Sequence, residues 1–142
     1  MNDQRIVQGG RSKAYRPIPE AERRAAIEDG LAAYHRGDFF LAHELLEPAW
    51  MGTADLPERE LLQGLIKLAA AFVHDARSNP LGIRKNLAGA RDRLAEGLYA
   101  GSRVGIDVVA LIAAVDARLG GAIEVGDPPI EIPPQDPTAG GG

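Results

Sequence analysis

The chain has 142 residues, of which 45% are hydrophobic and 25% charged, a composition typical of a soluble globular protein with one domain. The formal net charge of −4 is spread over intermixed acidic and basic residues, which argues against a nucleic-acid partner. The absence of cysteine excludes disulfides, thiolate metal sites and a cysteine nucleophile. No apolar run approaches the roughly 18 residues of a membrane span, and no signal peptide is recognisable, so we expect a cytoplasmic protein without a membrane partner.

Apolar periodicity and helix-ending residues predict an all-α fold, a compact bundle of about five helices within a single domain over residues 17–120. Proline or aspartate precedes most of the expected helices, and glycine or Asn79-Pro80 follows several of them. The expected helices span about 17–37, 38–52, 57–78, 80–99 and 106–119, with a loop between Gly101 and Gly105.

The two ends of the chain lack helical periodicity. Residues 1–16 are polar and are expected to form a flexible or extended N-terminal arm. Residues 121–142 are rich in proline and glycine and are expected to form an extended tail. Within this tail, prolines flank Ile130 and Ile132 and restrict their backbone, so we expect these two side chains to pack over an apolar groove.

The second predicted helix carries acid and imidazole groups among aromatic residues, in the order H-E-x-x-E. His43 and Glu47 are one turn apart and share a helix face, a spacing that lets two side chains reach one ion. The metalloprotease motif H-E-x-x-H needs histidine where Glu47 stands, so the protease interpretation is poor. Three alternatives remain: a buried ion pair between Glu47 and an arginine, a small-molecule or anion pocket, and a metal site.

The third predicted helix has a polar stripe that permits two interpretations. A stripe opposite Leu65 and Phe72 is typical of a solvated helix face. Alternatively, the stripe faces the second helix, and a guanidinium on it pairs with Glu47. The stripe consists of Arg59, Gln63, Lys67, His74 and Arg77.

Taken in order, these motifs resemble a helical family catalogued as domain of unknown function 309. The resemblance covers roughly residues 25–120 and rests on H-E-x-x-E-x-x-W together with Arg59, the Gln63-Gly64 pair and His74. It implies a compact all-α fold and no established activity. It also favours the interpretation in which the polar stripe of the third helix faces the second helix. The candidate polar site is therefore His43, Glu44, Glu47, Trp50, Arg59, Gln63 and His74.

These observations predict a non-catalytic binding or interaction module, with no cofactor, whose polar residues join the second and third helices. Its partner is expected to be a small molecule or a protein, and a homodimer is possible. The alternative is a metal-dependent or acid–base hydrolase that uses His43, Glu47 and His74. The two hypotheses differ in geometry, because the module predicts Glu47 paired with Arg59 and the hydrolase predicts three side chains converging on one point.

Overall fold

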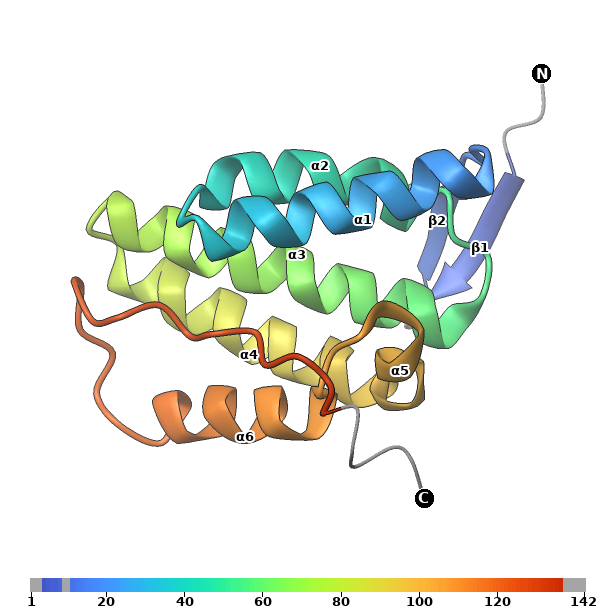
Figure 1. Ribbon diagram of the computed structural model, residues 1–142. Coiled ribbons are helices and arrows are strands. Elements are labelled where there is room, and N and C mark those ends of the chain that lie inside the picture. The colour runs from blue at the N-terminus through green and yellow to red at the C-terminus, as the bar shows by residue number, and fades with distance from the viewer. Residues whose placement is uncertain (1–3, 9–10, 137–142) are drawn as a thin grey trace.

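The computed structural model describes residues 4–8 and 11–136 and is built mainly from helices (Figure 1). The long helix α3, Leu56–Ala76, lies in the middle. On one side of it pack α1, Glu20–His35, and α2, Phe39–Met51; on the other side packs α4, Pro80–Glu96. The prediction of an all-α fold is therefore confirmed for the body of the protein. None of the described helices is long and apolar enough to cross a membrane.

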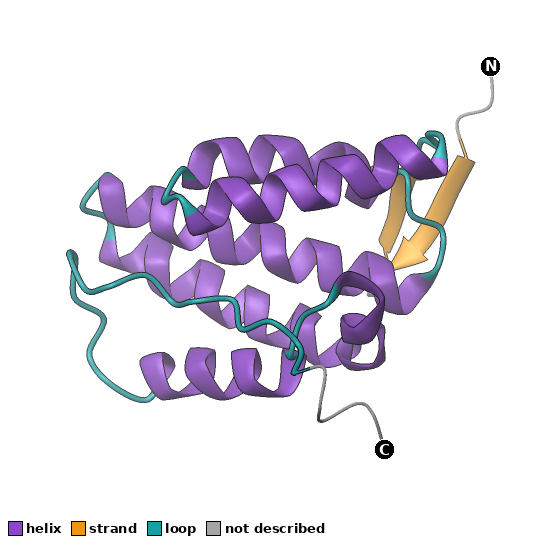
Figure 2. Ribbon diagram, viewed as in Figure 1, coloured by secondary structure: helices purple, strands orange, loops and turns teal. Residues whose placement is uncertain are grey.

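The polypeptide between α4 and the last helix is helical where the sequence predicts a loop. A 3-10 turn, Leu98–Ala100, leads directly into a short helix α5, Gly101–Val104, and α6 then spans Val108–Leu119 (Figure 2). The described part of the chain thus has six α-helices rather than about five. Four residues are too few for an apolar period to be visible in the sequence, which explains why α5 escapes prediction.

Side-chain caps fix where four of the helices begin. A carboxylate or amide oxygen accepts a hydrogen bond from the backbone N–H three residues later, satisfying a donor that the first helical turn leaves free. The capping residues, with their N···O distances, are Asp38 at 3.4 Å, Asp55 at 3.2 Å, Asn79 at 3.1 Å and Asp107 at 3.0 Å.

Close helix contacts depend on residues without a side chain. A Cβ on Gly64 would lie 2.9 Å from Leu94 Cγ, and one on Gly97 would lie 2.5 Å from the backbone nitrogen of Leu61. Glycine at these positions lets α3 and the end of α4 approach closely, so that Leu61 and Leu94 are fully buried between them.

Both ends of the chain adopt defined structure outside the helices. Strand β1, Gln4–Gln8, pairs antiparallel with β2, Arg11–Tyr15, in the region expected to be a flexible or extended arm. After α6, the chain returns along the bundle, and Ile130 and Ile132 are each only 4% exposed. The hydroxyl of Tyr34 on α1 donates to the Ile130 carbonyl at 2.5 Å, so this segment joins the core that the helices form.

Candidate functional site

The buried side of α2 centres on small residues and not on His43. Ala42 and Ala49 are fully buried and Leu46 is 1% exposed. At about 100° per residue, His43 lies about 90° and Glu47 about 130° from the middle of this buried face. Glu47 is accordingly exposed, and the expected buried ion pair between Glu47 and an arginine is wrong.

The reason for this difference is the tight packing of α1 against α2. A Cβ on Gly30 would lie 2.6 Å from Leu46 Cγ, so only small residues fit beside Leu46 at the crossing. The aromatic residues near His43 in the sequence lie toward the edge of this buried face or beyond it, and Phe40 is 58% exposed.

His43 and Trp50 are partly buried, and each has a ring nitrogen without a hydrogen-bond partner among the described residues. His43 Nδ1 lies 3.6 Å from a carboxylate oxygen of the exposed Glu44, too far for a hydrogen bond, and Trp50 Nε1 is likewise buried without a hydrogen-bond partner. Glu44 and Glu47 line a shallow hollow of about 360 Å³ with Arg16, Ile18, Pro48 and Met51. These residues share a surface of α2, but they do not form an interhelical ion-pair network.

Arg59 is the member of the predicted set that does join α2 to α3. It is fully buried, and its Nη1 donates to the backbone carbonyls of Trp50 at 2.8 Å and Thr53 at 3.1 Å. Its guanidinium carbon also lies 4.7 Å from the centroid of the Trp50 ring, a cation–π contact. Burial lowers the pKa of Arg59, because desolvation disfavours the charged form. Arg59 therefore neutralises the carbonyl end of α2 and does not pair with Glu47.

The other predicted residues of α3 do not converge on that point. Gln63 is half-buried one turn after Arg59. His74 lies fifteen residues after Arg59, about 22 Å along the helix, and its Nδ1 is 3.1 Å from the amide nitrogen of Asn79. Across residues 4–8 and 11–136, no three His, Cys, Asp or Glu side chains gather closely enough to hold a metal ion. The hydrolase alternative, which needs His43, Glu47 and His74 together, finds no support.

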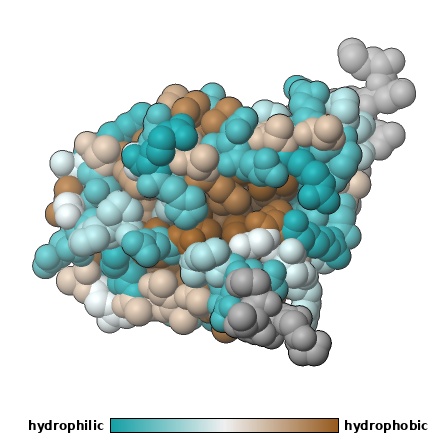
Figure 3. All heavy atoms as spheres, in the orientation of Figure 1, coloured by the Kyte–Doolittle hydropathy of each residue, from teal (hydrophilic) through white to brown (hydrophobic). Residues whose placement is uncertain are grey.

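A cleft of about 390 Å³ lies between α1, α3 and α5, away from the predicted set. Three apolar side chains, Ile27, Leu31 and Val104, line it together with six charged ones: Glu20, Arg23, Arg24, Glu28, Glu58 and Arg103. In the same view as Figure 1, hydrophobic residues gather in the middle of this face between α1 and the C-terminal segment, with hydrophilic residues around them (Figure 3). The surface here is thus apolar at its centre and charged at its margin.

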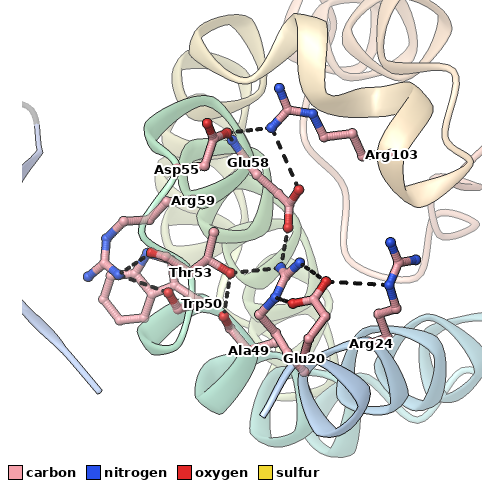
Figure 4. A network of polar contacts seen from close by, with 10 residues as sticks. Glu20, Arg24, Ala49, Trp50, Thr53, Asp55, Glu58, Arg59 and Arg103 are labelled. Atoms are coloured by element: carbon pink, nitrogen blue, oxygen red, sulfur yellow. Dashed lines mark hydrogen bonds and ion pairs between the residues drawn. The ribbon is translucent and has the colours of Figure 1, made fainter. Parts of the chain in front are cut away.

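Ion pairs order the charged side of the cleft (Figure 4). Arg23 donates to both carboxylate oxygens of Glu20, at 2.7 and 2.8 Å, and also contacts Glu58. The hydrogen bond from Arg23 holds the pKa of Glu20 below its usual value, and the pKa of Arg23 is raised in turn. From α5, Arg103 reaches Asp55 at 2.5 Å and Glu58 at 3.8 Å.

Thr53 connects this cluster to the buried arginine. Its hydroxyl accepts from Arg23 at 3.0 Å and donates to the Ala49 carbonyl at 2.7 Å, while its own carbonyl accepts from Arg59. The α2–α3 loop is therefore tied to α1 and α3 by buried polar contacts, which fix one wall of the cleft.

Sequence reasoning missed the cleft because its parts come from distant positions. Arg23 and Arg24 lie on the first predicted helix, Glu58 begins the third, and Arg103 lies in the stretch expected to be a loop. One signal was present: Arg23 lies four residues before Ile27 and eight before Leu31, close to the apolar stripe of α1.

Comparison with known proteins gives a match to one family model over part of the chain. Residues 27–86 match the family model described as Domain of unknown function (DUF309), which confirms the resemblance noted in the sequence over this part of the chain. No curated protein and no solved structure matches the chain. All seven predicted polar residues fall inside the matched region, whereas Arg23, Arg24 and Arg103 fall outside it.

Proposed function

We propose that the helical core containing this DUF309 region serves as a non-catalytic binding module, and that it takes a small molecule in the cleft between α1, α3 and α5. The observation that carries the proposal is the composition of the cleft. Its volume of about 390 Å³ is within the range of small-molecule sites, and three apolar side chains lie beside six charged ones that can orient a ligand.

The wall of the cleft is ordered before any ligand arrives. Glu58 is 8% exposed and Arg23 is 13% exposed, and their contact joins α1 to α3. Side chains held in this way lose little further freedom when a ligand binds, so more of the contact energy is available for affinity.

A titration followed by two-dimensional NMR tests the proposal. Octanoate and octanol serve as probes, because together they cover a charged and a neutral head on the same apolar chain. We expect at least one of them to shift backbone amide signals of α1, α5 and the start of α3.

Two variants localise the binding. Leu31→Trp places a large side chain at the cleft and should abolish the shifts, whereas Leu81→Trp changes a residue on α4 that is 80% exposed and should leave them unchanged. The proposal is overturned if no probe with an octyl chain, octanoate and octanol among them, shifts these amides, or if Leu31→Trp binds as the unmodified chain does.

A further inference from the structure

The two outer arginines of the cleft, Arg24 and Arg103, keep N–H donors that make no hydrogen bond or ion pair within the described part of the chain. Arg24 pairs with Glu20 through Nε, at 3.4 Å, and its two terminal nitrogens form no ion pair or hydrogen bond with the described residues. Arg103 uses Nη1 for both Asp55 and Glu58, and its Nε and Nη2 form no ion pair or hydrogen bond with residues 4–8 and 11–136. Figure 4 shows the two guanidinium groups on either side of the Glu20 and Glu58 carboxylates, Arg24 from α1 and Arg103 from α5.

The acids at the cleft are mostly occupied. Glu20 is shared by Arg23 and Arg24, and Glu58 by Arg23 and Arg103. A cationic ligand would have to displace an arginine from one of these carboxylates or rely on the exposed Glu28 alone. An anionic ligand meets the N–H donors of Arg24 and Arg103 directly, and the carboxylates beside those donors, Glu20 and Glu58, already have arginine partners.

Guanidinium groups have a preferred ligand chemistry. Their planar N–H pairs match the two oxygens of a carboxylate or phosphate group, and such charge-assisted bonds are about twice as strong as neutral ones. Arg24 and Arg103 have side chains that are 65% and 49% exposed, so both can reorient toward a ligand. The apolar residues Ile27, Leu31 and Val104 beside them favour a hydrocarbon chain over water.

From this arrangement we propose that the ligand is a small amphipathic oxyanion, a carboxylate or phosphate group attached to an apolar chain. The oxyanion binds the free nitrogens of Arg24 and Arg103, and the chain lies against Ile27, Leu31 and Val104. This inference rests on the proposed function, since it names the chemical class of the molecule that the same cleft takes.

Four probes with one chain length test the head group: octanoate, octyl phosphate, octanol and octylamine, each measured by NMR titration below its aggregation concentration. We expect both anions to bind about tenfold or more tightly than octanol, the ratio that about 1.4 kcal/mol of extra hydrogen bonding provides. Octylamine should bind more weakly than octanol. The tighter of the two anions identifies the head group as carboxylate or phosphate.

Substitutions then assign the effect to the arginines. Arg24→Gln should weaken octanoate binding several-fold and leave octanol unchanged, and because Arg24 is largely exposed the variant keeps its fold. Combining it with Arg103→Gln should remove the remaining preference for anions. Arg91→Gln is the matched control, since Arg91 is 42% exposed on α4 and pairs with Asp116 away from the cleft.

The outcomes separate this inference from the proposed function. If octanol or octylamine binds in the cleft as tightly as the anions, or if Arg24→Gln leaves octanoate binding unchanged, the oxyanion class is wrong while the binding module stands. If none of the four probes shifts the amides of the cleft, both proposals fail.

Discussion

Replacing Arg59 by methionine removes the charge that joins α2 to α3 and keeps an apolar stem of comparable length. Two hydrogen bonds from a charged donor are lost, to the carbonyls of Trp50 and Thr53, each worth about 1.5–3 kcal/mol. Part of this loss is offset, because the buried guanidinium no longer has to be desolvated. We expect the free energy of unfolding to fall by about 3 kcal/mol, which lowers the melting temperature by about 6–12 °C for a chain of this size.

Chemical denaturation followed by far-ultraviolet circular dichroism measures this change. The fluorescence of Trp50, the single tryptophan, should change as well, because Arg59 lies over its ring. Arg59→Lys keeps a positive charge but loses the planar guanidinium and its several N–H donors. Its free energy of unfolding should therefore lie between those of the unmodified chain and Arg59→Met.

The matched comparison is Glu47→Ala. Removing this exposed carboxylate of α2 should change the free energy of unfolding by no more than about 0.5 kcal/mol, although the sequence pattern suggested that Glu47 is the buried partner of Arg59. Equal destabilisation by Glu47→Ala and Arg59→Met would refute the conclusion that Glu47 is exposed and unpaired with Arg59, and it would support a Glu47–Arg59 ion pair instead. A loss below about 1 kcal/mol for Arg59→Met would refute the role given to the two carbonyls.

Two further predictions concern the packing of the core. Burial raises the pKa of Tyr34 above its ordinary value of 10.0, so the folded state keeps the phenol protonated and the protein loses stability as the pH rises above about 10. Tyr34→Phe should be less stable than the unmodified chain at neutral pH, but its free energy of unfolding should fall less between pH 9 and 11. Denaturant midpoints measured across this pH range test the prediction. Gly97→Ala places a Cβ 2.5 Å from the Leu61 backbone nitrogen and should lower the free energy of unfolding by about 2 kcal/mol, as measured by thermal unfolding. Gly121→Ala should be nearly neutral, because a Cβ there meets no described atom within 4 Å. Similar losses of stability for the two variants would contradict the close contact at Gly97.

The sequence was most informative where a local rule decides the outcome. Asp38 marks the start of α2, because a capping oxygen needs only the next three residues, and the Asn79-Pro80 pair follows the end of α3 as expected. Local periodicity likewise identified the buried side of α3, including Leu65 and Phe72, because large apolar residues recur there at helical spacing.

The orientation of α2 was predicted less well, for a physical reason. A helix that crosses its neighbour closely buries small residues at the crossing, and Ala42 and Ala49 carry little weight in a pattern dominated by aromatics. The role of Arg59 depends on backbone carbonyls, which every residue carries, so no sequence motif announces them. The cleft depends on the distance between α1 and α5, which arises only from the tertiary fold.

The segment that carries Ile130 and Ile132 also bears on how the protein is made. These side chains lie at the end of the described chain, yet they fill the core beside α1, to which Tyr34 binds the segment. During synthesis the helices emerge from the ribosome before this segment does, and their apolar groove stays uncovered until it follows. The nascent protein therefore exposes this apolar surface until residues 130–132 have left the ribosome, and a ribosome that stalls before then would present an incomplete core to chaperones and proteases.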